Sequence, residues 1–97
     1  MKQGGYIYIL TNKNNKVIYV GVTSNLGKRI WEHRNGKFKN SFTSRYNISK
    51  LVYYEEYLSI EDAIVREKQL KAGSRQKKIE LIEKRNPRWE ELFKEKL

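Results

Sequence analysis

The chain has 97 residues, of which 21 are Lys or Arg and 11 are Asp or Glu, so its formal net charge at pH 7 is +10. This length allows one compact core, and we expect residues 1–97 to form a single domain. The chain contains no cysteine, which excludes disulfide bonds, thiolate zinc sites and a cysteine nucleophile.

The positive charge indicates an anionic partner, because a basic domain otherwise repels itself. Nucleic acid is favoured, since neutralising its phosphates releases counterions. A membrane surface would require a basic amphipathic helix with a broad apolar face, and no apolar run approaches the ~20 residues of a membrane span. The N-terminal segment becomes polar too early for a signal peptide, so we expect a cytoplasmic protein. A basic protein without an anionic partner is the plain alternative.

Two β-strands are predicted first, because residues 5–12 and 16–22 are rich in β-branched and aromatic side chains. Asn14 and Asn15 lie between these segments and favour a turn, since Asn tolerates the left-handed conformation. The two strands are therefore expected to form an antiparallel hairpin.

Side chains alternate across a strand, so the hairpin has two different faces. If Asn14-Asn15 is a two-residue turn, Tyr8 lies opposite Gly21, and Tyr19 lies diagonally beside Tyr8 on the same face. That tyrosine face is either half-solvated packing or a functional site in which Gly21 leaves room for a phosphate. The other face is the expected core and carries Ile7, Ile9, Ile18 and Val20.

A helix is predicted over residues 26–35, because capping residues precede it and Gly36 follows it. Arg29 and His33 are four residues apart, so their side chains lie on one side of this helix. A guanidinium suits phosphate oxygens, and the single histidine of the chain can move a proton near neutral pH. A lone exposed histidine is usually only solvated, but this pair opposite a tyrosine face indicates a site.

The second half of the chain predicts a polar, basic loop, a third strand and further helices. The expected elements are the loop from Lys37 to Lys50, a strand over 50–57, helices over 60–72 and 75–85, a break at Asn86-Pro87, and a short terminal helix holding Trp89, Leu92 and Phe93. This order, ββαβαα plus a short C-terminal helix, predicts an α+β domain. Its small three-stranded sheet should be largely antiparallel and flanked by helices.

Glu67 interrupts the helix predicted over 60–72. Its apolar stripe consists of Ile60, Ala63, Ile64 and Leu70, and Glu67 falls in the middle of that stripe. An ionised carboxylate is costly there unless it is paired or binds a metal. Three interpretations stay open: Glu67 is a metal ligand, it pairs with a nearby Arg or Lys, or the stripe is partly exposed.

These residues occur in an order that resembles the GIY-YIG nuclease superfamily. Tyr6-Ile7-Tyr8 stands where the first motif stands, with Tyr6 in place of the motif glycine, and Tyr19-Val20-Gly21 resembles the second motif. The stretches TSNLGKRIWEH and REKQLK follow in family order, and RQKKIELIEKRNPRWEEL resembles the tail of the small stand-alone bacterial endonuclease type. The resemblance covers nearly the whole chain.

The resemblance implies a metal-dependent phosphodiesterase. By motif position it implies catalytic roles for Tyr8, Tyr19, Arg29 and His33 and a metal-binding role for Glu67. Asn86 is a possible counterpart of a late family asparagine, so its place in the site stays open. The expected metal is Mg²⁺ or Mn²⁺, both of which accept few protein carboxylates and keep several waters.

We therefore expect an endonuclease that hydrolyses phosphodiester bonds in nucleic acid, with DNA favoured over RNA and with structure-directed or weak sequence specificity. Arg29 would neutralise charge on the phosphate, and Tyr8 or Tyr19 would take the proton of the attacking water, with His33 orienting or relaying. The alternative is a non-catalytic nucleic-acid-binding module on the same fold. A third possibility is a structural protein that docks through the Trp89–Phe93 tail, although packing of that tail on its own domain is favoured. The sequence does not define an oligomeric state.

Overall fold

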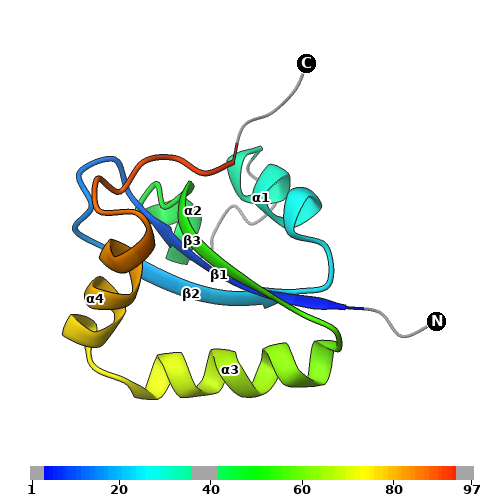
Figure 1. The fold of residues 1–97 in the computed structure, drawn as a ribbon. Coiled ribbons are helices and arrows are strands. Elements are labelled where there is room, and N and C mark those ends of the chain that lie inside the picture. The colour runs from blue at the N-terminus through cyan, green and yellow to red at the C-terminus, as the bar shows by residue number, and fades with distance from the viewer. Residues whose placement is uncertain (1–3, 36–41, 94–97) are drawn as a thin grey trace.

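The computed structural model describes residues 4–35 and 42–93, and it confirms the α+β class (Figure 1). In chain order the elements are β1 (Gly5–Thr11), β2 (Ile18–Thr23), α1 (Leu26–Arg34), α2 (Phe42–Arg45), β3 (Lys50–Tyr57), α3 (Ile60–Ala72) and α4 (Arg75–Arg85). The strands form one antiparallel sheet in the order β2-β1-β3. No helix within the described ranges is both long and apolar enough to cross a membrane.

The predicted hairpin register is confirmed, although its turn is longer than predicted. Tyr8 pairs with Gly21, and Tyr19 pairs with Leu10. The connection between β1 and β2 runs over residues 12–17, and Asn15 adopts a positive φ of 60° within it. A connection with an even number of residues keeps the alternation that a two-residue turn would give. The tyrosines therefore lie on one face, as expected.

The sheet separates two cores (Figure 1). α3 packs against β1 and β2 on the aliphatic face, where the buried residues include Ile7, Ile9 and Val20. The opposite face buries Tyr8 and Leu10 together with Ile30 of α1. The helices on the two sides thus make a three-layer domain, with the tyrosine face covered by α1.

The capped starts of the helices agree with the sequence. The Asn25 side chain accepts a hydrogen bond from the Lys28 amide at 3.1 Å, which caps α1. The Ser59 hydroxyl does the same for the Asp62 amide at the start of α3. Gly36, the expected stop of α1, lies outside the described residues, as does the first part of the expected loop over 37–50. The remainder of that loop contains α2, which was not predicted.

The apolar stripe of α3 differs in one position from the prediction. Ala63 and Leu70 are buried and Ile60 is partly buried, whereas Ile64 is 37% exposed. The buried side of α3 follows steps of three and four residues through Glu67, so Ile64 falls on its flank. The prediction that Ile64 belongs to the stripe was wrong.

The predicted terminal helix is also wrong for the residues that the structure describes after α4. Asn86 is buried, and its amide donates to the carbonyl of Val52 at 3.0 Å and to that of Glu90 at 2.9 Å. The Leu92 amide donates to the Leu51 carbonyl at 2.8 Å, so the segment attaches to β3. The Leu92 backbone amide finds its partner in the sheet instead of in a helical turn, and the donor of Asn86 is its side-chain amide. The packing of the tail on its own domain is confirmed, because Trp89 is buried in the core.

Candidate active site

The tyrosine face of the hairpin is held by a close contact between Tyr8 and Gly21. Tyr8 is fully buried, and its ring lies across the backbone of Gly21. A Cβ atom at position 21 would overlap Cζ and Oη of Tyr8 and lie 2.8 Å from Cε1. Gly21 is therefore required by the position of the tyrosine ring, which occupies the space that the sequence suggested for a phosphate.

The rings of Tyr8, Tyr19 and His33 form a compact cluster. Their centroids lie 6.3 Å apart for the two tyrosines, 6.0 Å for Tyr8 and His33, and 5.9 Å for Tyr19 and His33. The Tyr8 hydroxyl is 3.3 Å from Nε2 of His33. α1 supplies the histidine and the sheet supplies the tyrosines, so the cluster depends on the packing of α1 over β1 and β2.

Thr43, on α2, completes this chain of hydrogen bonds and was missed by the sequence analysis. Its hydroxyl lies 3.0 Å from Nδ1 of His33, and the residue is buried. Both ring nitrogens of His33 thus have a partner, which fixes the orientation of the imidazole. A four-residue helix leaves no periodic signal in a sequence, so nothing in the pattern pointed to Thr43.

Arg29 adds a positive charge to the cluster. Its Nε lies 3.5 Å from the carboxylate of Glu32, which is also on α1. Glu32 is buried although its side chain carries a charge. Burial and the neighbouring Tyr19 raise the pKa of Tyr8, and the interactions with Arg29 lower it by less. Glu32 was not predicted, although its spacing three residues after Arg29 is the signal that could have found it.

The environment shifts the titration of two members of the cluster. Burial strongly raises the pKa of Tyr8, and the neighbouring Tyr19 raises it further. Burial also lowers the pKa of His33, as does the charge of Arg29, while Glu32 opposes that shift. At neutral pH the Tyr8 hydroxyl is protonated and the imidazole is neutral, so a tyrosine hydroxyl faces a potential proton acceptor.

Glu67 stands on a separate element from the other predicted site residues. α3 lies on the aliphatic face of the sheet, opposite α1 (Figure 1). The Glu67 side chain is 13% exposed, and its carboxylate forms an ion pair with Lys71 at 2.7 Å. The inward position is as predicted, and the pairing with a lysine is one of the three interpretations that the sequence left open.

The residues present fit a loosely held divalent cation and not a closed metal cage. Within the described part of the chain, no three His, Asp or Glu side chains gather as they would around a metal. Mg²⁺ and Mn²⁺ often use one or two carboxylates together with substrate phosphates and waters. Lys71 is 53% exposed, so its ammonium group would return to water if a cation bound beside Glu67.

Comparison with known proteins decides the family. The GIY-YIG catalytic domain model matches residues 4–80. The chain belongs to the GIY-YIG family. A UPF0213 protein of Syntrophus aciditrophicus is 40% identical over 82 residues, which cover 84% of this chain and 92% of that protein. A UPF0213 protein of Clostridium perfringens is 37% identical over 90 residues, covering 93% and 95% of the two chains.

The fold of this GIY-YIG domain is similar to a solved UPF0213 structure. The solution NMR structure of a UPF0213 protein from Bacillus halodurans aligns with a TM-score of 0.56 and 31% identity, covering 91% of this chain and 92% of that one. The matched family region ends before Asn86, and the contacts of Asn86 are with β3 and the tail. Asn86 therefore serves the packing of the C-terminal segment.

Proposed function

We propose that this protein is a metal-dependent endonuclease that hydrolyses phosphodiester bonds in nucleic acid, with DNA as the favoured substrate. Its membership of a nuclease family supports the reaction class. The cluster of Tyr8, Tyr19, His33 and Arg29 carries the proposal, because it joins a proton-transfer chain to a guanidinium.

The proton of the attacking water is transferred through the ring cluster. Tyr19 is partly exposed and interacts with Tyr8, so it is the tyrosine that can contact water. Tyr8 is a poor base by itself because its pKa is strongly raised by burial. It can accept a proton from Tyr19 only as it passes its own to Nε2 of His33. Proton relay to a neutral imidazole avoids a buried tyrosinate.

The remaining groups act on the phosphate and on the histidine. Arg29 neutralises charge that develops on the phosphate oxygens, since its guanidinium carries the positive charge of the cluster. Thr43 holds the imidazole of His33 in place. When the Thr43 hydroxyl accepts a hydrogen bond from Nδ1–H, Nε2 carries no proton. Glu67, on α3, would hold a divalent cation, and the chemistry that such an ion would supply when bound is polarisation of a phosphate.

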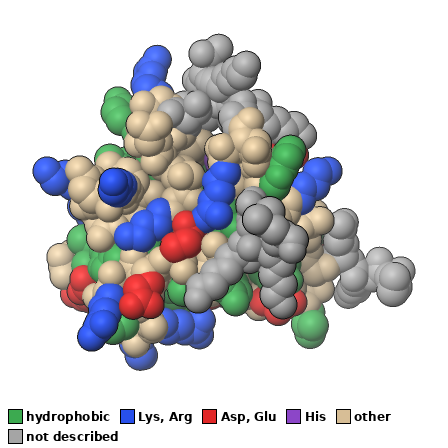
Figure 2. Space-filling model, turned by 90° about the horizontal axis from the view of Figure 1, so that it is seen from above, with side chains coloured by type: hydrophobic (Ala, Val, Ile, Leu, Met, Phe, Trp, Pro, Cys, Tyr) green, Lys and Arg blue, Asp and Glu red, His purple; other side chains and the backbone are tan. Residues whose placement is uncertain are grey.

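The surface supports a nucleic-acid substrate. Figure 2 views the molecule from the top of Figure 1, and Lys and Arg side chains are spread across that face with acidic side chains among them. Distributed positive charge suits contact with a phosphate backbone and carries no sequence information. Weak sequence specificity is consistent with such a surface.

The test is a cleavage panel of labelled duplex, branched and single-stranded DNA and RNA, incubated with Mg²⁺, Mn²⁺ or a chelator. Tyr19→Phe should slow cleavage strongly, whereas the matched variant Tyr57→Phe should cut like the parent. Tyr57 also loses a hydroxyl, but its partner is Glu55, at 2.5 Å. If the parent binds these substrates without cutting any of them, the binding-module alternative is the better description.

A further inference from the structure

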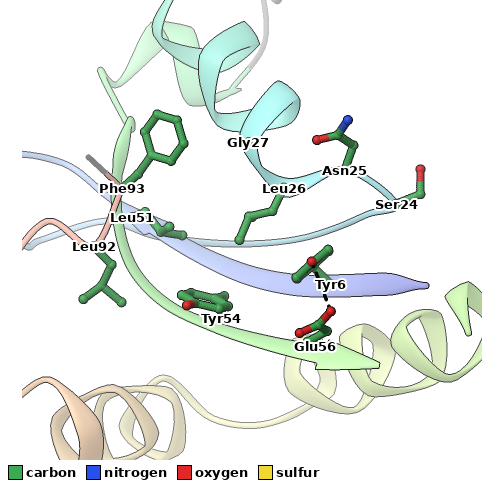
Figure 3. Close-up of a pocket in the computed structure, with 10 residues that line it drawn as sticks. All are labelled: Tyr6, Ser24, Asn25, Leu26, Gly27, Leu51, Tyr54, Glu56, Leu92 and Phe93. Carbon is green, nitrogen blue, oxygen red and sulfur yellow. Dashed lines mark hydrogen bonds between the residues drawn. The ribbon is translucent and has the colours of Figure 1, made fainter. Parts of the chain in front are cut away.

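A concave site lies on the tyrosine face, on the β3 side of the sheet (Figure 3). It has a volume of about 690 Å³. Its sides come from the start of α1, from β1 and β3, and from the C-terminal segment, and its lining includes Tyr6, Leu26, Tyr54, Glu56, Leu92 and Phe93. We call it the β3 pocket.

The β3 pocket begins next to the candidate active site. Tyr6 precedes Tyr8 by two residues on β1, so both side chains leave the same face of the strand. Across the sheet Tyr6 pairs with Glu56, and Tyr8 pairs with Tyr54. The pocket thus lies two residues along β1 from the buried tyrosine, on the flank of α1 that carries Gly27.

The walls of the β3 pocket suit a flat aromatic group. Tyr54 is 42% exposed and Leu92 is 41% exposed, which are high values for such large apolar side chains. Phe93 and Leu26 are partly buried against the core and face the same pocket (Figure 3). Exposed aromatic rings beside a nucleic-acid site are suited to stacking on an unpaired base.

The charged group in the lining of the pocket is Glu56, beside the polar side chains of Ser24 and Asn25. Tyr6 donates a hydrogen bond to Glu56 Oε2 at 3.2 Å (Figure 3). A carboxylate repels phosphate and accepts hydrogen bonds only. It therefore suits the donor edge of a base and disfavours the backbone.

Guanine is the base whose donor edge fits best. Its N1–H and N2–H groups are adjacent donors that can meet two carboxylate oxygens together, whereas the donor of adenine is flanked by an acceptor. These guanine groups are occupied in a base pair, so the base must be unpaired. We propose that the β3 pocket is a subsite for an unpaired guanine of the substrate strand, an inference that rests on the proposed nuclease function.

The binding test uses labelled oligothymidylates, as DNA and as the RNA equivalents, in which one central base is left unchanged or replaced by guanine, adenine or cytosine. Affinity is measured by fluorescence anisotropy at low salt in a chelator, so that binding is read without cleavage. The parent should prefer the guanine oligomer over the adenine oligomer by about tenfold or more, as bidentate base contacts do. Equal affinities for all four would overturn the proposal.

Variants assign the preference to the pocket. Glu56→Gln should remove the guanine preference, while the matched variant Glu61→Gln should keep it. Glu61 is an exposed glutamate in the first turn of α3, so this control removes the same charge elsewhere. Tyr54→Leu should weaken binding of every oligomer that carries a purine. If Glu56→Gln and Glu61→Gln lose the guanine preference equally, the preference is a general effect of charge and the proposed contact with Glu56 is wrong.

A measurement without variants checks the location. Guanosine 5′-monophosphate, added to ¹⁵N-labelled protein, should shift the amide signals of Gly27, Tyr54 and Glu56, and adenosine 5′-monophosphate should shift them less. Cleavage of the same oligomers separates the two proposals. Cutting with no dependence on guanine or on Glu56 defeats the subsite and leaves the nuclease proposal standing. A guanine preference without cutting under any metal supports guanine binding in the pocket and defeats the nuclease proposal.

Discussion

Gly21→Ala should destabilise the fold and disturb the candidate site together. The new Cβ would lie 2.8 Å from Cε1 of Tyr8 and would overlap Cζ and Oη. Carbon atoms pack best at about 3.5–4.0 Å, so the ring must move by roughly 1 Å. Overpacking of a core costs about 1–3 kcal/mol. The 3.3 Å contact between Tyr8 and His33 would be lost in the process.

Thermal and denaturant unfolding measure the effect, since a loss of 1 kcal/mol lowers the Tm of a domain this small by roughly 4–8 °C. Gly73→Ala is the matched control. A Cβ there lies 3.4 Å from the nearest backbone oxygen, and the φ of Gly73 is −79°, so the control should be neutral or stabilise by about 0.4–1 kcal/mol. A Gly21→Ala variant as stable as the parent would refute the close packing of Tyr8 on Gly21.

Four further predictions concern the site. Arg29→Ala should lower turnover by roughly 10²–10³ with little change in binding, and unchanged cleavage would remove Arg29 from the site. Glu67→Gln should keep nucleic-acid binding, abolish cleavage and reduce stabilisation by added Mg²⁺ or Mn²⁺, whereas cutting at the parental rate would end the metal-ligand proposal. Cleavage should persist at pH values just below the ordinary histidine pKa of about 6.5 and fall only as pH drops through the lowered pKa of His33, because the imidazole must be neutral. Thr43→Val should change the tautomer of this single histidine in ¹⁵N NMR spectra and slow cleavage, with Thr43→Ser restoring both; an unchanged tautomer in Thr43→Val would contradict the role of Thr43.

The pH dependence of stability follows from the same histidine. A lowered pKa means that the folded state holds the proton of His33 less tightly than the unfolded chain does. The contribution of the neutral imidazole to stability is therefore complete above about pH 6.5, and it is lost as pH falls through the unfolded value toward the lowered one.

Local patterns predicted much of the fold. The alternation of Tyr8 and Ile9 on β1 defined the two faces, and the structure confirms that register because one face must be buried. The capping residues Asn25 and Ser59 marked the starts of two helices, since their side chains satisfy free backbone amides. Such features depend on neighbours in the chain, so they are visible in the sequence.

The features that the sequence missed depend on distant partners. α2 is a four-residue helix that places Thr43 against His33, which comes ten residues earlier. The terminal helix expected around Trp89 is replaced by a segment in which the Leu92 amide donates to the Leu51 carbonyl and the indole ring of Trp89 packs in the core. Helix propensity could not reveal either feature, because tertiary hydrogen bonds decide them.

One helix connects the candidate active site with the β3 pocket. α1 buries Ile30 against the sheet, presents Arg29 and His33 toward the ring cluster, and contributes Gly27 to the pocket on its other flank. A shift of α1 would therefore alter both places at once. If an unpaired guanine binds beside Gly27, it contacts the same rigid element that carries the guanidinium and the imidazole. Substrate that fills the pocket would hold α1 in the position that the proton relay requires, which couples recognition of an unpaired base to cleavage in a domain of 97 residues.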